Sequence, residues 1–345
     1  MNLDKRHHSY LEDLANATSL VGIDQIYNKS FLITGATGLI GTFLIDALMY
    51  LNKKGANISV YAVGRNREKA SLRLGEYYDN PLFCYIEQDV RNPLPSNLNV
   101  DYIIPLASNT HPLAYSQFPV ETIDINVKGA EYALQVAERC YSTVLYPSSV
   151  EIYGNARGTD VFTEDYTGQL NLSNARSCYP ESKRISEALC QSYCAEKGVD
   201  VKIARLSRII GPTMLESDSK ASTQFIMKAL RGEDVVLKSK GEQFYSYTYV
   251  ADVVNAFLFI LLYGQKGEAY NVASEKCNIH LRDFANLCAC QAGKKVIYDL
   301  PSDVESKGYS IANQAIMDSG RLEKLGWVSK YDISEALRRI LDIIK

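Results

Sequence analysis

The sequence has no long apolar run, little net charge, few histidines and no regular cysteine spacing. No stretch reaches the roughly 18 apolar residues of a membrane-spanning helix, and residues 1–19 lack the apolar core of a secretory signal. A net charge of −3 gives no electrostatic footprint for nucleic acid, and no basic helix marks a membrane surface. We therefore expect a cytoplasmic protein that binds neither nucleic acid nor a membrane.

The eight cysteines and four histidines give no sign of disulfide or metal chemistry. Neither Cys190/Cys194 nor Cys288/Cys290 has the spacing of a zinc or redox motif. Scattered cysteines of this kind are typical of reduced residues that serve as small packing groups. The histidines do not cluster with other ligand side chains, so we expect no bound metal.

Short, apolar, β-rich runs alternate with helical stretches along most of the chain. The runs occupy residues 30–34, 57–63, 82–87, 100–108, 142–149 and 199–207. Such alternation is typical of a parallel sheet with helices on both faces. Beyond about residue 208 the alternation loosens into helix 222–232, strand 234–238, helix 252–263, strand 268–273 and helix 332–344.

This pattern predicts an α/β protein with a doubly wound parallel sheet and a smaller C-terminal α/β lobe. The sheet domain comprises residues 30–207 and about 246–272, and the lobe comprises about 208–245 and 273–345. Residues 1–29 form a helical extension. A cleft between the two parts is the default place for a substrate.

The segment "ITGATGLIG" places Gly35, Gly38 and Gly41 between the first strand and the first long helix. Glycines allow a tight turn and a close approach to a pyrophosphate, whose charge is favoured at a helix N-terminus. The strand–turn–helix context predicts a dinucleotide site. The alternative is an ordinary glycine-rich turn between a strand and a helix.

The end of the second strand bears on the choice between NAD and NADP. An acid there would bind the ribose 2′-OH of NAD, but the sequence is "YAVGRNREK", with Gly64 in that place and Arg65 and Arg67 after it. The missing acid and the two arginines favour a 2′-phosphate, although both could be solvated loop residues. Asp89, after the third strand, could accept a hydrogen bond from the adenine amino group.

Tyr179 and Lys183 stand four residues apart at the start of a predicted helix, so they share one face. A tyrosine, with an ordinary pKa of about 10, serves as a base only if its phenolate is stabilised. A neighbouring ammonium would do this, and Lys183 could also hold the nicotinamide ribose. Ser149 could hydrogen-bond the reacting oxygen. Tyr50 and Lys54 have the same spacing, but they end a helix away from the glycine turn, which predicts a surface pair.

Three motifs in this order, "TGATGLIG", "SSVEIYG" and "YPESK", resemble the extended short-chain dehydrogenase/reductase family of nucleotide-sugar epimerases and dehydratases. The resemblance runs from about residue 30 to the end. It implies a Rossmann domain, a tightly bound nicotinamide cofactor (usually NAD), a nucleotide-sugar substrate, and a homodimer through helices 121–140 and 179–197. The implied cofactor contacts are Gly35, Thr37, Gly38, Leu39, Ile40, Gly41, Val90, Leu106, Ala107, Ser108, Asn126 and Lys183.

Within the family, a hydroxyl residue, one intervening residue and Glu151 look most like the UDP-glucuronate decarboxylases and GDP-mannose dehydratases. The resemblance implies oxidation at sugar C4, followed by decarboxylation or dehydration, with Glu151 as base or electrostatic partner. Its alternative role is a structural carboxylate. A C4 epimerase, an NADPH-dependent reductase and a catalytically silent cofactor-binding protein are the other interpretations.

Two positions depart from the family pattern. Tyr245 stands where these enzymes carry an arginine that binds the pyrophosphate or the carboxylate, and a phenol cannot replace that charge. Arg208 stands where a substrate-binding asparagine is common. We predict that Arg208 supplies the missing charge from across the cleft, although it could also be a surface residue. The predicted substrate contacts are Ser108, Ser148, Arg208 and Tyr245.

Overall fold

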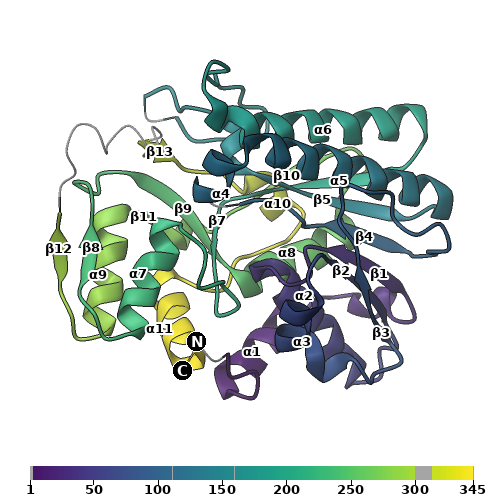
Figure 1. Cartoon of the computed structure of the whole chain (residues 1–345), viewed down its shortest axis with the longest axis horizontal. Helices are drawn as coiled ribbons and strands as arrows, with labels where there is room; N and C mark the ends of the chain where they lie inside the picture. The colour runs from purple at the N-terminus through teal and green to yellow at the C-terminus, as the bar shows by residue number, and fades with distance from the viewer. Residues whose placement is uncertain (1–2, 111, 159, 300–312, 345) are drawn as a thin grey trace.

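A computed structural model describes residues 3–110, 112–158, 160–299 and 313–344. Residues 300–312, part of the predicted smaller lobe, lie outside the described residues. A seven-stranded sheet, parallel throughout, runs through the centre in the order β10-β6-β5-β4-β1-β2-β3 (Figure 1). Its strands are β1 Ser30–Thr34, β2 Ser59–Gly64, β3 Phe83–Glu87, β4 Tyr102–Pro105, β5 Thr143–Ser149, β6 Asp200–Leu206 and β10 Ala269–Val272.

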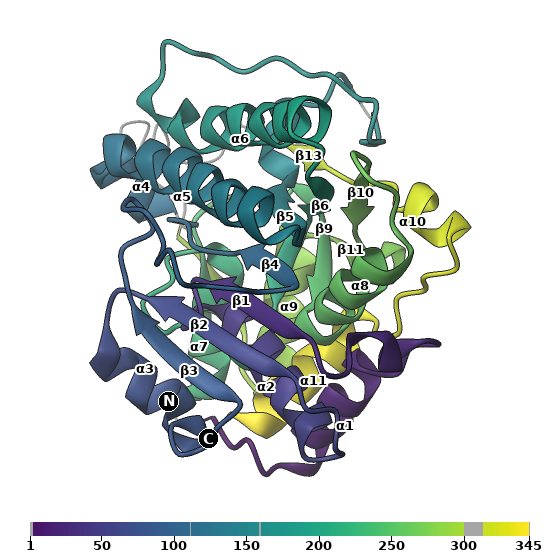
Figure 2. The same ribbon diagram turned by 90° about the vertical axis from the view of Figure 1, so that its right-hand side faces the viewer.

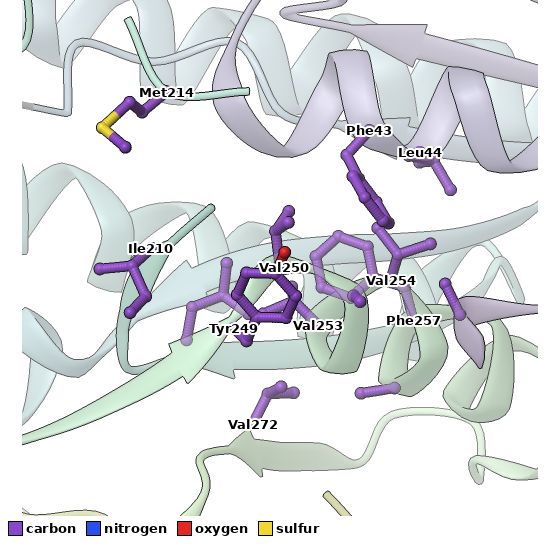
Figure 3. Close-up of a cluster of buried hydrophobic side chains, with 14 of the residues drawn as sticks. Phe43, Leu44, Ile210, Met214, Tyr249, Val250, Val253, Val254, Phe257 and Val272 are labelled. Carbon is purple, nitrogen blue, oxygen red and sulfur yellow. The ribbon is translucent and has the colours of Figure 1, made fainter. Parts of the chain in front are cut away.

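Helices cover both faces of this sheet, as the sequence predicts. Alternate side chains of β1 serve the two faces, with Phe31 and Ile33 in one apolar cluster and Leu32 in the other. The first face is covered by α2 (Leu39–Asn52) and α8 (Val250–Tyr263), whose Phe43 and Phe257 lie close together (Figure 3). The second is covered by α5 (Pro119–Cys140) and α6 (Cys178–Glu196), which run side by side (Figure 2). The predicted doubly wound fold is therefore confirmed.

The order of strands reverses between β1 and β4. From β1 the chain builds β2 and β3 on one side and then crosses back to β4 on the other. Ligands of such sheets bind outside the carboxyl ends of the strands at this reversal. The turn after β1 therefore stands at the place that the fold provides for a cofactor.

The smaller lobe contains two further sheets beside the large one (Figure 1). The predicted helix and strand near residues 222–238 are present as α7 and β8. The sequence does not predict the sheet in which β9 pairs with β7, β11 and β13. The elements are β7 Arg208–Ile210, α7 Ala221–Leu230, β8 Val235–Leu237, β9 Phe244–Tyr249, β11 Asn278–His280, α9 Leu281–Gln291, β12 Val296–Tyr298, β13 Gln314–Ala315, α10 Gly320–Lys324 and α11 Ile333–Ile343. The remaining α-helices are α3 Arg67–Leu74 and α4 Pro112–Gln117.

The N-terminal helix α1 (His8–Ala17) ties the two parts of the molecule together. It packs against α2, α8 and α11. Its fully buried Asp13 accepts hydrogen bonds from Tyr249 (2.5 Å), Tyr331 (2.8 Å) and Arg339 (2.7 Å). A buried carboxylate is stable only with such partners, and these come from β9 and from the C-terminal segment. The extension therefore helps to hold β9 and the C-terminal segment together.

Candidate functional site

A cavity of about 1440 Å³ lies at the carboxyl ends of the central strands and extends into the smaller lobe. The glycine turn forms one end of it, and α7 and β8 form the other. None of the described residues 3–29 lines it, so the N-terminal extension is no lid over this cavity. Most of the predicted site residues line it, namely Gly35, Thr37, Gly38, Leu39, Ile40, Gly41, Arg65, Val90, Leu106, Ala107, Ser108, Ser148, Ser149, Glu151, Tyr179, Arg208 and Tyr245.

The glycine turn is tight because two of its residues have no side chain. Gly35 has φ +65°, and a Cβ there would lie 2.7 Å from the backbone nitrogen of Ala107. A Cβ at Gly41 would collide with the carbonyl oxygen of Gly35. The helix α2 starts directly after Gly38 and presents its free N–H groups to the turn. The residues present therefore fit a dinucleotide.

Four predicted cofactor contacts do not line the cavity: Arg67, Asp89, Asn126 and Lys183. Arg67 is paired with Glu87 (3.2 Å) on the neighbouring strand. Asp89 is held by Arg91 (2.7 Å). Each of these two side chains is thus paired with a protein group of opposite charge, and neither lines the cavity.

Asn126 is buried behind the cavity wall and acts through its neighbours. Its amide donates to Ser182 Oγ (2.8 Å) and accepts from Ser108 Oγ (2.7 Å). Ser108 lines the cavity and Ser182 lies on α6 between the two catalytic candidates. Asn126 therefore joins the loop after β4 to α6, and its contact with the cofactor stays a prediction.

Tyr179 is a buried phenol whose ring faces the cavity. It stacks on Tyr115 of α4 at a centroid distance of 5.4 Å. Burial raises the pKa of Tyr179 to about 12, a hydrogen bond with the Ser149 side chain lowers it, and the charge of Glu151 raises it. Ser149 therefore lies where the sequence predicts, beside the phenol. The protein alone, however, makes this phenol less acidic than usual.

Lys183 lies one turn along α6 but is not hydrogen-bonded to Tyr179. Its ammonium donates to the carbonyl of Pro147 (2.8 Å) and lies 4.9 Å from the centre of the Tyr146 ring. Burial lowers the pKa of Lys183 to about 8. The causes that set the pKa of Tyr179 are burial, Ser149 and Glu151, so the effect of the Lys183 ammonium on the phenol stays a prediction.

The segment between β5 and the next turn carries two more polar groups into the cavity. Glu151 lies in the 3-10 helix Val150–Tyr153, where its N–H donates to Ser149 Oγ (3.2 Å). Ser148 lines the cavity, and its buried hydroxyl has no hydrogen-bond partner among the described residues. A buried hydroxyl without a partner is costly, which makes Ser148 a ready contact for a polar ligand.

Arg208 and Tyr245 form one unit in the cavity wall. The guanidinium carbon of Arg208 lies 3.5 Å from the centre of the Tyr245 ring. This closeness follows from the pairing of β7 with β9, in which Arg208 is opposite Tyr247. The prediction that Arg208 acts from across the cleft is therefore wrong: it occupies the same side as the position that lacks the arginine.

Arg208 has no counter-charge within the described part of the chain. No carboxylate lies within ion-pair distance of it there, and its Nη1 is buried without a hydrogen-bond partner. A buried guanidinium nitrogen without an acceptor is unfavourable by 1–3 kcal/mol or more, so on the order of that energy is available to an anionic ligand. The stack on Tyr245 holds the guanidinium flat against the wall.

Several cavity residues escape the sequence analysis. Tyr115 comes from the short helix α4, and Arg176 lies 5.7 Å from the centre of its ring. At the far end the cavity is lined by three lysines, Lys220, Lys228 and Lys238. Their spacing shows no motif, and two of them have acidic partners: Lys220 is paired with Asp218 (2.8 Å) and Lys228 with Glu233.

Two kinds of site are missing from the ranges that the structure covers. Across residues 3–110, 112–158, 160–299 and 313–344, no group of three or more His, Cys, Asp or Glu side chains could hold a metal ion. In the same ranges no helix is both long and apolar enough to cross a bilayer.

The chain belongs to the NAD dependent epimerase/dehydratase family, whose sequence pattern matches residues 31–273. Among its relatives, UDP-glucuronic acid decarboxylase 6 of Arabidopsis thaliana is 31% identical over 313 residues, which are 90% of this chain and 87% of that protein. UDP-glucuronic acid decarboxylase 1 of Xenopus tropicalis is 33% identical over 233 residues, which are 68% of this chain and 53% of that protein.

Solved structures show the same fold. DesIV, a dTDP-glucose 4,6-dehydratase from Streptomyces venezuelae with NAD bound, matches with a TM-score of 0.78 at 22% identity, covering 90% of this chain and 95% of that one. UDP-glucose 4-epimerase from Thermotoga maritima matches with a TM-score of 0.78 at 21% identity, covering 91% and 98%. The resemblance drawn from the three motifs is therefore confirmed at the level of family and fold.

Proposed function

We propose that this protein oxidises the sugar of a nucleotide sugar at C4 and then removes a C5 carboxylate, as a UDP-glucuronate decarboxylase does. The observation that carries the proposal is Arg208. It is a cation without a carboxylate partner among the described residues, in the cavity that also contains Tyr179 and Glu151. A uronate carboxylate supplies the missing charge. The decarboxylases among the relatives support this choice.

The proposed chemistry assigns a task to each cavity group. When bound, a nicotinamide dinucleotide takes a hydride from C4 and later returns it. Tyr179 accepts the O4 proton, and Ser149 hydrogen-bonds the same oxygen. The resulting ketone lies β to the carboxylate, so the electron pair of the breaking C5–C bond moves to the C4 oxygen, where the Tyr179 hydroxyl donates. Carbon C5 then gains a proton, which Glu151 delivers, and the C4 ketone forms again before the hydride returns.

Dehydration is the second candidate, and Glu151 is the observation that favours it. Its carboxylate lines the same cavity as Tyr179. With a 4-keto sugar that has no carboxylate, a base at this position can remove the C5 proton while a hydroxyl leaves C6 as water. The need for Arg208 separates the two candidates, because a dehydratase substrate has no sugar carboxylate to meet it.

Mass spectrometry of the products tests the proposal directly. The enzyme is incubated with UDP-glucuronate, UDP-glucose, dTDP-glucose, GDP-mannose and CDP-glucose in turn. We expect loss of carbon dioxide from UDP-glucuronate. Loss of water from another sugar would replace the decarboxylase with a dehydratase, and turnover without a mass change would indicate an epimerase.

Binding to an Arg208→Met variant sharpens the assignment. A hydrogen bond to a charged group is worth about 1.5–3 kcal/mol, so UDP-glucuronate should bind about 10- to 100-fold more weakly. UDP-xylose, which lacks the carboxylate, should bind within about twofold of the wild-type affinity. Arg67→Met, outside the cavity, is the matched control. Equal losses for both ligands would place Arg208 at the pyrophosphate and remove the support for decarboxylation.

We also propose that the dinucleotide is NADP and that it stays bound through turnover. Support comes from the end of β2, where Gly64 stands in the place of the acid that binds a ribose 2′-OH. Arg65, one of the two predicted cations, lines the cavity beside it. Arg67, the other, does not.

We also propose that the protein forms a homodimer and that it works in the cytoplasm. The exposed faces of α5 and α6 carry the apolar side chains Val120 (73% exposed), Ile123 (44%) and Ile185 (53%), which a partner would cover. All eight cysteines are free thiols, which suits a reducing compartment. A molar mass in solution equal to that of one chain would rule out the dimer.

A further inference from the structure

The wall at the end of β2 excludes the acid that NAD-binding sheets use. Gly64 lines the cavity, and a Cβ there would lie only 2.9 Å from the hydroxyl oxygen of Tyr85. An aspartate in this place would therefore force the Tyr85 ring to move. Among the described residues, the carboxylates that line the cavity are Glu151 and Asp218, and neither belongs to β2 or β3.

The basic residues around this wall differ in how far their charges are already used. Arg65 is paired with Glu121 (2.7 Å) and lies 3.9 Å from Asp89. Arg73 donates to the carbonyl of Thr213 (2.6 Å) and to a threonine hydroxyl. The charges of both arginines are therefore stabilised by protein groups.

Lys69 is the exception. It lies in the first turn of α3, lines the cavity and is half-buried. Within the described ranges its ammonium has neither an ion pair nor a hydrogen-bond partner. Burial, and then the charges of Arg73 and Arg65, lower the pKa of Lys69. A cation that is partly desolvated next to two like charges is stabilised by an anion in the cavity.

We propose that Lys69 binds the 2′-phosphate of NADP and is the residue that selects NADP over NAD in this chain. The inference rests on the proposed use of the cavity as a dinucleotide site. A phosphate with charge near −2 at this place would neutralise Lys69 and reduce its repulsion from Arg65. The cation that the sequence suggests, Arg67, is replaced by one that lies two residues further along, on the cavity side of α3.

The dinucleotide carried by the purified protein gives the first test. Wild type, Lys69→Met and the control Arg67→Met are prepared side by side, and the released dinucleotide is identified by mass spectrometry. We expect NADP from wild type and from Arg67→Met, and a shift to NAD or loss of cofactor in Lys69→Met. NAD released from wild type, or NADP retained by Lys69→Met at the wild-type ratio, would overturn the inference.

Titration calorimetry separates this inference from the function on which it rests. The ligands are 2′,5′-ADP and 5′-AMP, which differ only in the 2′-phosphate. Wild type should bind 2′,5′-ADP about 10- to 100-fold more tightly, and Lys69→Met should lose that ratio while its affinity for 5′-AMP stays the same. Equal binding of the two ligands by wild type would overturn the role of Lys69 alone. Binding of neither ligand, together with no released dinucleotide, would overturn the dinucleotide site itself.

Discussion

Among the tyrosine–lysine pairs with four-residue spacing, Tyr50/Lys54 and Tyr179/Lys183 lie in opposite surroundings. At the end of α2, the ammonium of Lys54 lies 4.2 Å from the centre of the Tyr50 ring, and Lys54 is exposed. On α6, Tyr179 and Lys183 are both buried and bond to other groups. The pair that makes direct contact lines only a small cavity of about 170 Å³, apart from the large one that contains Tyr179.

Burial, rather than spacing, therefore distinguishes the candidate catalytic pair from the surface pair. Helical spacing brings i and i+4 side chains to one face, and at the surface they simply pack on each other. In α6 each group has a separate anchor: Ser149 for the phenol and Pro147 for the ammonium. The phenol is thus fixed in the cavity wall, while the ammonium is anchored without lining the cavity.

The buried pair is also incomplete without its ligand. The pKa of Tyr179 is about 12 and that of Lys183 about 8, so the lysine titrates first. A base with this order of pKa values works poorly near neutral pH. An oxidised nicotinamide ring held next to Tyr179 would act in the direction that the proposed mechanism requires, because an opposite charge favours the phenolate.

The largest expected effect is a loss of turnover when the hydroxyl group of Tyr179 is removed. Removal of the Tyr50 hydroxyl is the matched control. Tyr179→Phe should lower turnover about 10²- to 10⁴-fold, the usual contribution of a general acid–base group. Its ring can still stack on Tyr115, so its unfolding temperature should change little. Tyr50→Phe should leave turnover within about twofold. Product formation from UDP-glucuronate, followed by mass spectrometry, measures both variants.

A Tyr179→Phe enzyme that keeps more than a tenth of the wild-type turnover would place the base elsewhere. Equal losses in the two phenylalanine variants would mean that both changes act through folding. Thermal unfolding of each variant separates that case from a loss of chemistry.

The sequence predicts the sheet well because local patterns determine it. Each central strand is a short apolar run between turns, and the first strand, Ser30–Thr34, has the predicted bounds. The glycine turn is also predictable, since Gly35 needs its positive φ and its closeness to Ala107. These features depend on residues that are near one another in the chain.

The parts that escape prediction depend on distant pairing and on helix phase. The strand β7 is only three residues long and pairs with β9 more than 30 residues later. The contact of Arg208 with Tyr245 therefore cannot be read from either segment. Arg67 and Lys69 differ in direction because α3 begins at Arg67, and a shift of the helix start by one residue would turn either side chain about 100° around the axis.

A smaller effect is expected on the free energy of unfolding, in which Lys183 and Lys54 should differ. The pKa of Lys183 in the folded protein, about 8, lies below its ordinary value of 10.5. The unfolded chain therefore binds more protons between these two pH values, so burial of the lysine destabilises the fold progressively as the pH falls from 10.5 to 8, and by a constant amount below 8. At about 1.4 kcal/mol per pH unit this amounts to roughly 3 kcal/mol.

Lys183→Met should consequently stabilise the dinucleotide-free protein at pH 7 while it removes turnover. The lost hydrogen bond to Pro147 offsets about 1 kcal/mol, so we expect a net gain of roughly 1–2 kcal/mol in the free energy of unfolding, which shrinks towards pH 9.5. Lys54→Met, on the exposed pair, should stay within about 0.5 kcal/mol at both pH values. Urea unfolding of the three proteins at pH 7 and 9.5 measures this. A gain for Lys183→Met that does not depend on pH would show that Lys183 is not a desolvated cation, and the contrast between the two pairs would then reduce to packing.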